Sequence, residues 1–425
     1  MSEVELKARR DQALGAGAAL FYAEPLHIVR GEGAYLFDAS GRRYVDMYNN
    51  VPCVGHANPV IVEAMARQQA TLNVHSRYLH EGVVAFAERL ASMHPPQIES
   101  VIFSCSGTEA NEVALRMARF VTGKRGIICT DATYHGNSDL VGGLTRLGKS
   151  QGGPKEVRAI PFPEQYRPLE AGAADPAAAY LDQLRQAIAS LEASGAGLAA
   201  FIVCSIFANE GLPDVPDGFM ARAAEIVREA GGLVIADEVQ AGYCRSGCWW
   251  GYEASGFTPD IVVTGKPMGN GFPLAATAAS RAAVETFRTK TRYFNTFASS
   301  PLQAAVGMAV LDEIDAQGLK DQVGQVGGKL KQALLDRKRC LSAIGDIRGV
   351  GLFIGIEMIK VGVAKTPDAA LAAAFSNRLK DKGFLTAPAG AFGNVVKIRP
   401  PLVFSQQDAD DFLVAFDAVV DELNG

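Results

Sequence analysis

The sequence lacks the features that mark several large classes of protein. Its seven cysteines are an odd number spread through 425 residues, which argues against a disulfide framework. Its 41 Lys and Arg residues are scattered and are outnumbered by 46 Asp and Glu, so no basic surface for nucleic acid or an anionic membrane is indicated. It has no apolar run of membrane-spanning length, and the start, MSEVELKARRDQALG, has no apolar signal core. We therefore expect a cytoplasmic protein that acts on small molecules.

A metal site is not predicted either. Cys244 and Cys248 are four residues apart, but no second pair of Cys or His follows at the spacing of a zinc site. The spacings of His75, His80 and His94 do not place them on one metal-binding face.

What the sequence does contain is a stretch, 231–271, with two short apolar runs at 233–236 and 261–264. Both runs are rich in β-branched residues and do not alternate, as is typical of buried parallel strands. Asp237 follows the first run and Lys266 comes just after the second, so both side chains should lie at the carboxyl edge of one sheet, where open α/β folds bind ligands. An acid and an amine at this edge suit a ligand with a cationic ring nitrogen and an aldehyde, which describes pyridoxal phosphate.

The order of the patterns predicts the fold class. Strand and helix patterns alternate from about residue 100 to about 280, which predicts an α/β fold with a mostly parallel sheet and helices on both faces. After about residue 310 one long helical run, 308–339, precedes a mixture of strands and helices. We expect an N-terminal arm that contributes to the small domain (1–55), a large domain that binds the ligand (56–310) and a C-terminal small α+β domain (311–425).

A second informative stretch begins with a short strand at 101–103 and continues through a turn of small residues into a helix. Ser106 and Glu109 have the spacing of a capping box. The free backbone N–H groups of such a helix N-terminus favour a phosphate, although a well-capped turn is also an ordinary structural feature. Tyr134 follows a strand ending at Thr130, and its ring would either pack at the rim of the sheet or stack on a planar ligand.

The motifs SGTEAN, YHGN, ADEVQ, TGKPMGNG and FNTFASSP occur in this order. The set resembles the class III aminotransferases, which are pyridoxal-phosphate-dependent enzymes of fold type I, and the resemblance extends from about residue 25 to the C-terminal helix. It implies a large domain with a mostly parallel seven-stranded sheet flanked by helices, a smaller α+β domain, and a homodimer that can assemble further into a tetramer.

The resemblance also implies a role for each matching residue. Lys266 would form the Schiff base with pyridoxal 5'-phosphate and then carry a proton between the substrate carbon and the cofactor. Asp237 would pair with the pyridine nitrogen and keep it protonated. Tyr134 would stack on one face of the ring and Val239 on the other, and Gln240 would approach the ring hydroxyl. The other implied cofactor-binding residues are Ser106, Gly107, Thr108, His135 and, from the neighbouring subunit, Thr296.

For the substrate, Arg399 matches the family arginine that takes the α-carboxylate of an amino or keto acid, because a guanidinium pairs with both carboxylate oxygens. A structural ion pair in the small domain is the alternative. Tyr48, Asn50 and Arg77 are further candidates for the wall of the substrate pocket.

Within the family, the segments IVRGEGAYLFDASGRRYVDMYNNVPCVGHANP, LNVHSRYLH and IGDIRGVGLFIGIEMIK resemble the branch that contains alanine-glyoxylate-type aminotransferases and phospho-lyases acting on phosphoethanolamine or phosphohydroxylysine. Cys204 stands where many relatives have a glutamate, and Ser299 and Ser300 replace a glycine-rich pair. The leading hypothesis is transfer of an amino group from an amine or amino acid to a keto acid, since Arg399 offers a grip for a carboxylate. β-Elimination of phosphate and binding of the cofactor without turnover are the alternatives.

Overall fold

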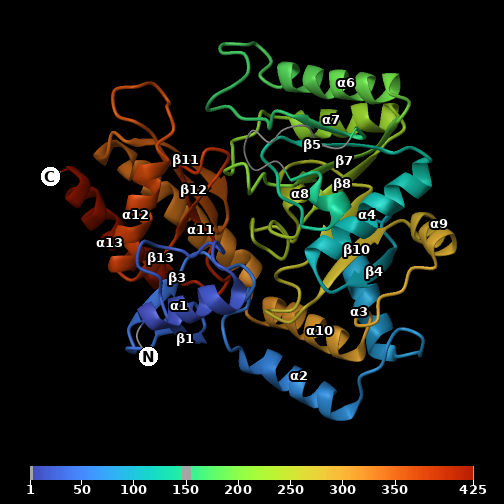
Figure 1. The fold of residues 1–425 in the computed structure, drawn as a ribbon, viewed down its shortest axis with the longest axis horizontal. Helices are drawn as coiled ribbons and strands as arrows, with labels where there is room; N and C mark the ends of the chain where they lie inside the picture. The colour runs from blue at the N-terminus through green and yellow to red at the C-terminus, as the bar shows by residue number, and fades with distance from the viewer. Residues whose placement is uncertain (1–2, 146–154, 425) are drawn as a thin grey trace.

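The computed structural model describes residues 3–145 and 155–424. A seven-stranded sheet forms the centre of the larger of two lobes, on the right of Figure 1, with the strand order β4-β10-β9-β8-β7-β5-β6. Neighbouring strands are parallel except where β10 runs antiparallel to both β4 and β9. The strands are β4 (Ser100–Ser104), β5 (Gly126–Thr130), β6 (Val157–Ile160), β7 (Leu198–Cys204), β8 (Leu233–Asp237), β9 (Ile261–Thr264) and β10 (Ala275–Ala279). The predicted mostly parallel seven-stranded sheet is confirmed.

Helices cover both faces of this sheet because both faces of its central strands are apolar. In β8, Ile235 packs in the cluster that includes α4 (Gly107–Thr122) and α9 (Arg281–Thr291), whereas Val234 and Ala236 pack in the cluster that includes α6 (Ala178–Ala193) and α7 (Phe219–Glu229). Two short helices, α5 (Asp139–Gly142) and α8 (Gly251–Ala254), lie in the connections of this lobe.

Where the sequence predicts one long helix over 308–339, the structure has two. The helix α10 (Pro301–Ala316) begins earlier, at a serine cap, and packs against α2 (Pro59–Thr71) and α3 (Glu81–Ser92). Gly318 then adopts φ +60° and separates α10 from α11 (Leu319–Arg337), which ends in the turn η1 (Lys338–Cys340). A glycine in the left-handed conformation is a common helix terminator, so the prediction of a continuous helix is wrong at this residue.

The smaller lobe joins the two ends of the chain, as Figure 1 shows in blue and red. Its antiparallel sheet consists of β11 (Ile344–Val350), β12 (Phe353–Met358), β15 (Val395–Ile398) and β14 (Ala387–Ala389), accompanied by α12 (Ala369–Asp381) and α13 (Gln406–Asn424). A second sheet consists of β1 (Ile28–Glu32), β2 (Tyr35–Asp38), β3 (Arg43–Asp46) and β13 (Phe384–Leu385). The parallel pairing of β3 with β13 ties the N-terminal arm to the small domain. The boundaries at residues 55 and 310 stay predictions.

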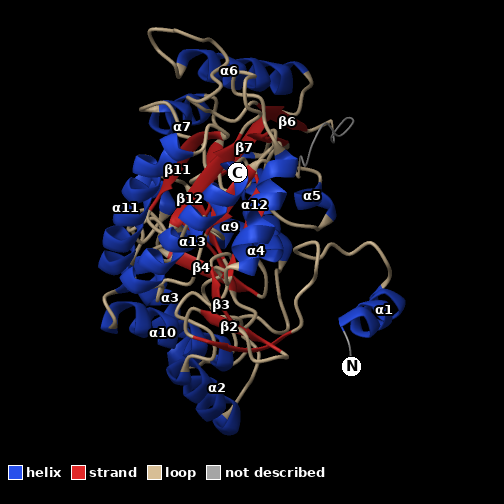
Figure 2. Ribbon diagram, turned by 90° about the vertical axis from the view of Figure 1, so that its left-hand side faces the viewer, coloured by secondary structure: helices blue, strands red, loops and turns tan. Residues whose placement is uncertain are grey.

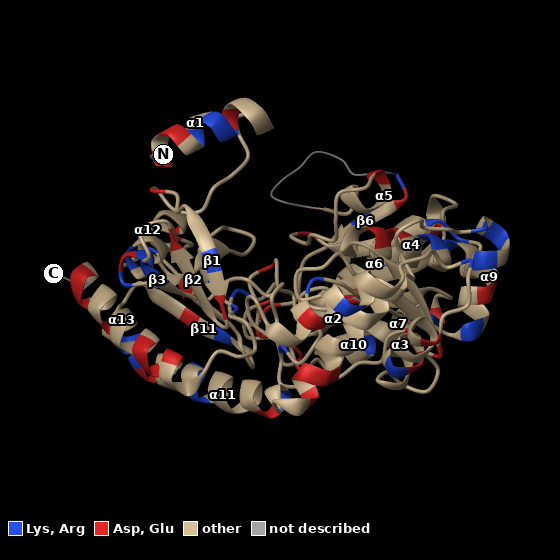
Figure 3. Cartoon of the chain, turned by 90° about the horizontal axis from the view of Figure 1, so that it is seen from below, with Lys and Arg blue, Asp and Glu red and all other residues tan. Residues whose placement is uncertain are grey.

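The first helix, α1 (Glu3–Leu14), has no buried residue. It lies apart from the body of the protein in Figures 2 and 3. Among the described residues, no helix is long and apolar enough to cross a membrane, and no cluster of three His, Cys, Asp or Glu side chains has the arrangement of a metal site.

Candidate active site

The carboxyl ends of the parallel strands surround a cavity of about 100 Å³. Asp237 ends β8, Cys204 ends β7, and Lys266 follows β9 by two residues. The residues that line the cavity are Gly107, Thr108, Tyr134, His135, Gly136, Cys204, Asn209, Asp237, Val239, Gln240 and Lys266. The structure thus brings together the predicted acid, the predicted amine and most of the residues predicted to bind the cofactor.

Lys266 is held in a setting that favours a neutral amine. Burial is the main cause that lowers the pKa of Lys266, and the nearby Arg399 lowers it further, while Asp237 raises it. A lysine amine must lose its proton before it can attack an aldehyde. The surroundings of Lys266 therefore prepare it for Schiff-base chemistry and for carrying a proton.

Asp237 is held by a network of hydrogen bonds that come from the large domain alone. Its Oδ2 lies 2.6 Å from His135 Nδ1 and accepts a hydrogen bond of 3.0 Å from Asn111 Nδ2. Its Oδ1 accepts a hydrogen bond of 3.0 Å from the backbone N–H of Val239. On the other side of the His135 ring, Nε2 lies 2.9 Å from the hydroxyl of Thr133. This chain fixes the orientation of the carboxylate and leaves Oδ1 able to accept a second hydrogen bond.

The first turn of α4 forms a cradle for a small anionic group. Ser106 caps the helix by accepting a hydrogen bond of 3.2 Å from the Glu109 backbone, but Glu109 accepts one from Cys105 rather than from Ser106, so only half of the predicted capping box forms. A Cβ added to Gly107 would lie 3.0 Å from the Val239 side chain. Glycine therefore leaves the backbone open toward the cavity, where N–H groups of a helix N-terminus bind phosphate.

These residues fit pyridoxal phosphate. The cradle suits its phosphate, Asp237 suits its ring nitrogen, and Lys266 suits its aldehyde. Tyr134 and Val239 both line the space in which the ring would lie. When bound, the cofactor holds the substrate amine and accepts the electrons released when a bond at the substrate carbon breaks.

Gln240 connects this cavity to Arg399. Its Oε1 accepts a short hydrogen bond from Arg399 Nη1, and its Nε2 donates one of 3.0 Å to Asn209 Oδ1. Arg399 also donates from Nε to the Tyr48 carbonyl at 2.9 Å, and its guanidinium lies 4.8 Å from the centre of the Tyr48 ring. Asn50 donates to the Gln240 carbonyl at 3.4 Å. Three of the predicted substrate residues therefore lie together, while the approach of Gln240 to the ring hydroxyl stays a prediction.

Two of the predicted residues, Thr296 and Arg77, are exposed and do not line the cavity. Thr296 lines a separate hollow of the surface together with His75 and Phe297. Arg77 is exposed, with its guanidinium 4.3 Å from the centre of the Phe294 ring. The role of Thr296 toward a neighbouring subunit stays a prediction.

Some residues around the cavity were missed by sequence reasoning. Asn111 was present in the motif SGTEAN, one helical turn after Gly107, and this spacing places both on one side of α4. Lys397 lies in a strand that ends one residue before Arg399, and in extended backbone this spacing puts both side chains on the same side. Thr133 and Asn209 lie in loops, and no periodic signal indicates their direction.

The fold and the arrangement around Lys266 define an α/β enzyme that uses pyridoxal phosphate. The chain belongs to the class III aminotransferase family, whose model matches residues 21–420. It is 37% identical to an alanine-glyoxylate aminotransferase 2-like protein of Drosophila melanogaster over 98% of this chain and 87% of that protein. It is 33% identical to an ethanolamine-phosphate phospho-lyase homolog 1 of Caenorhabditis elegans over 100% of this chain and 94% of that protein.

A solved structure extends this comparison. A phospholyase from Arthrobacter in complex with phosphoethanolamine is 39% identical, with a TM-score of 0.94 over 98% of this chain and 99% of the other. The resemblance to the family and to both parts of its branch is confirmed, and so is pyridoxal phosphate as the cofactor.

Proposed function

We propose that this protein is a pyridoxal-phosphate-dependent phospho-lyase that acts on a phosphorylated amino alcohol such as phosphoethanolamine. The observation that carries the proposal is that the buried positive charge of Arg399 has no directly paired carboxylate, although Asp46 acts on it electrostatically. This side chain is buried, its guanidinium hydrogen-bonds an amide oxygen and a carbonyl, and it makes no ion pair within the described chain. Where many relatives have a glutamate, Cys204 is present, and burial raises the pKa of its thiol, so it carries no charge at neutral pH.

A buried guanidinium without a directly paired carboxylate suits a substrate that brings more negative charge than a single carboxylate. Phosphate monoesters carry close to two negative charges at neutral pH. The similarity to the phospholyase in complex with phosphoethanolamine supports the same proposal.

In the proposed reaction, the residues of this chain position the substrate and move one proton. Lys266 takes the proton from the carbon that bears the amino group, and Asp237 keeps the cofactor ring ready to accept the electron pair. The C–O bond on the neighbouring carbon then breaks, and phosphate leaves with the electrons of that bond. The unsaturated amine that remains takes up water and yields an aldehyde and ammonia.

Transamination is the second candidate function. The planar guanidinium of Arg399 favours it, because its N–H groups can bind a carboxylate. A guanidinium pairs with both oxygens of an α-carboxylate, and the similar Drosophila protein carries the name of an alanine-glyoxylate aminotransferase. In this case Lys266 returns the proton to the cofactor rather than allowing a group to leave, and a keto acid is needed to complete the cycle.

Incubation of the holoenzyme with phosphoethanolamine in the absence of any keto acid separates the two candidates. The lyase releases phosphate and ammonia in equal amounts, whereas alanine and ethanolamine give neither product. Turnover that depends strictly on an added keto acid would overturn the proposed function in favour of transamination. The absence of any absorbance change with a panel of amines would instead favour a cofactor-binding protein without turnover.

We also propose that the protein is a homodimer. Tyr78, Leu79 and Phe297 are large apolar side chains that are exposed near the hollow lined by Thr296, and exposed apolar patches of this kind mark protein interfaces. A Phe297→Glu variant is expected to shift the protein toward monomers in analytical ultracentrifugation. A Thr296→Val variant is expected to retain the dimer but to lose cofactor more readily on dialysis. A wild-type monomer that retains the cofactor would contradict this arrangement.

A further inference from the structure

Lys397 is a buried lysine beside the cavity for which neither the sequence motifs nor the family match supplies a role. It lies on β15, two residues before Arg399, and is 3% exposed. Its ammonium group and the Arg399 guanidinium each lie 5.6 Å from the centre of the same ring, that of Phe353. The two cations therefore project from one side of the small-domain sheet around a shared aromatic side chain.

No carboxylate neutralises this lysine. In the part of the chain that the structure describes, Lys397 makes no ion pair, and the acid that interacts with it electrostatically is Glu210. Glu210 is also buried, but its Oε1 accepts a hydrogen bond of 2.5 Å from Thr130, and its Oε2 has no hydrogen-bond partner. The acid is thus held by the large domain while Lys397 belongs to the small domain.

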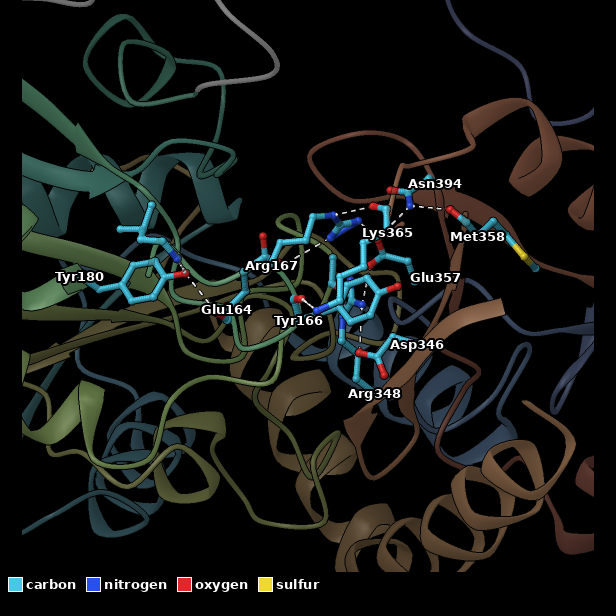
Figure 4. A network of polar contacts seen from close by, with 12 residues as sticks. Glu164, Tyr166, Arg167, Tyr180, Asp346, Arg348, Glu357, Met358, Lys365 and Asn394 are labelled. Carbon is cyan, nitrogen blue, oxygen red and sulfur yellow. Dashed lines mark hydrogen bonds and ion pairs between the residues drawn. The ribbon is translucent and has the colours of Figure 1, made fainter. Parts of the chain in front are cut away.

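The loop that carries Glu210 is itself fixed in place. Arg348 donates a hydrogen bond of 3.0 Å from Nε to the carbonyl of Gly211, the next residue. Arg348 is held in turn by Glu357 at 2.5 Å, within a network that also includes Arg167 from the large domain (Figure 4). The network therefore holds the backbone next to Glu210 against the small domain.

A buried cation without a partner destabilises the folded protein unless a ligand supplies the missing charge. We propose that Lys397 and Arg399 together form the subsite that binds the phosphate group of the substrate, and that Lys397 selects phosphate over carboxylate. Two cations on one side match the two negative charges of a phosphate, whereas a single carboxylate leaves one buried cation unpaired. The proposal rests on the proposed phospho-lyase function for its substrate but is tested separately by anion binding.

The charges around Lys397 predict that binding of a dianion is linked to proton uptake. Burial is the main cause that lowers the pKa of Lys397 to about 7; Arg399 and Lys266 lower it as well, whereas Cys204 and Glu210 raise it. A bound dianion favours the protonated ammonium and so raises this pKa. Above pH 7, affinity for a dianion should therefore fall as the pH rises, by up to about tenfold per unit.

Sulfate is a suitable probe because it is a dianion that does not titrate in this range. Calorimetry measures sulfate binding to the holoenzyme at about pH 8, in two buffers that differ in ionisation enthalpy. The holoenzyme is used because the cofactor phosphate would fill the cradle at α4 and leave only the second site open to sulfate. The wild type is expected to take up about one proton per sulfate. A Lys397→Met variant should bind sulfate at least about tenfold more weakly and without proton uptake, since one charge-assisted contact is lost.

Two further variants keep the test specific. Lys397→Arg retains a permanent charge, so it should bind sulfate without proton uptake. Lys360→Met removes one exposed lysine of the small domain and should behave as the wild type. No sulfate binding to the wild-type holoenzyme, or unchanged affinity and proton uptake in folded Lys397→Met, would overturn the subsite.

The experiments distinguish a wrong assignment of the phosphate subsite from a wrong assignment of the lyase activity. If the wild type binds sulfate through Lys397 but releases no phosphate from phosphoethanolamine, the proposed lyase is wrong and the anion subsite stands. If the wild type is a lyase but Lys397→Met keeps the same KM for phosphoethanolamine, the subsite is wrong. With both proposals correct, Lys397→Met raises the KM at least about tenfold, with a smaller change in kcat.

Discussion

Two groups of residues differ in how their charges are satisfied: the cofactor wall of the cavity, which includes Asp237, and the proposed substrate wall beside it, which includes Arg399 and Lys397. On the cofactor wall, both oxygens of Asp237 and both ring nitrogens of His135 have hydrogen-bond partners, and all of these come from the large domain. On the substrate wall, Arg399 and Lys397 come from the small domain and make no ion pair in the described chain. The residue at the end of β7 that faces them is the uncharged Cys204.

The polar groups of the cofactor wall are satisfied within the protein itself, whereas the cations of the substrate wall gain a charged partner only when a ligand binds. A satisfied buried network rigidifies the groups within it, and such rigidity is needed to hold a cofactor ring in one orientation. A wall with unpaired cations costs stability, and the cost is offset only when an anion arrives. Substitutions on the cofactor wall should therefore lower mainly kcat, and substitutions on the substrate wall should raise mainly KM.

The largest effect should come from Lys266→Ala. This change removes the amine that anchors the cofactor and moves the proton, so turnover should fall by at least about 10⁴-fold. The absorbance of covalently held cofactor should disappear as well. Spectra and single-turnover assays check this, and retention of that absorbance in the variant would contradict the role of Lys266 as the anchor.

Asp237→Asn should come next. The amide keeps the size of the side chain but removes the negative charge that pairs with the ring nitrogen, so kcat should fall by about 10²- to 10³-fold. KM for the substrate should change little, because Asp237 lies on the cofactor wall. A variant with normal kcat and raised KM would reverse the assignment of the two walls. Near-wild-type thermal unfolding would show that the fold is intact.

The sequence predicts the cofactor wall better than the substrate wall, for a physical reason. Short runs of β-branched residues indicate buried strands, and the residues that end such strands must meet at one edge of a parallel sheet. Asp237 and Lys266 are therefore placed together by the pattern alone. The reversed strand β10 does not disturb this, because it lies outside β7, β8 and β9.

The substrate wall depends on contacts between domains, which no local pattern encodes. Lys397 lies on β15 and Arg399 directly follows it, but their position opposite Cys204 follows from how the small-domain sheet packs on the large domain. The same limit applies to Thr296, whose predicted role lies in another subunit. In the predicted long helix, 308–339, the sequence shows that residue 318 is a glycine. It does not show that this glycine adopts a positive φ and ends the helix.

Lys397→Met should stabilise the protein, by about 2 kcal/mol at neutral pH, because it replaces a buried unpaired cation with an apolar side chain of similar length. The pKa of Lys397 falls from 10.5 to about 7 on folding. Between these values the unfolded chain binds more protons, so wild-type stability rises with pH. The advantage of the variant should therefore shrink from pH 7 toward pH 10 in chemical denaturation. A destabilised variant would indicate that Lys397 has a partner within the folded chain.

The smallest effect should come from Thr133→Val. This variant tests whether the hydrogen-bond chain that orients Asp237 extends beyond His135 to Thr133. The change retains the shape of the side chain but removes the hydrogen bond to His135 Nε2. Loss of one such bond is worth about 1 kcal/mol, which corresponds to about a fivefold fall in kcat. KM should stay unchanged, and the pH profile of kcat should shift because His135 connects Thr133 to Asp237. Thr133→Ser, which restores the hydroxyl, should recover both the rate and the profile. If Thr133→Val lowers stability but leaves the pH profile of kcat unchanged, Thr133 contributes only to packing. The hydrogen-bond chain that orients Asp237 would then end at His135.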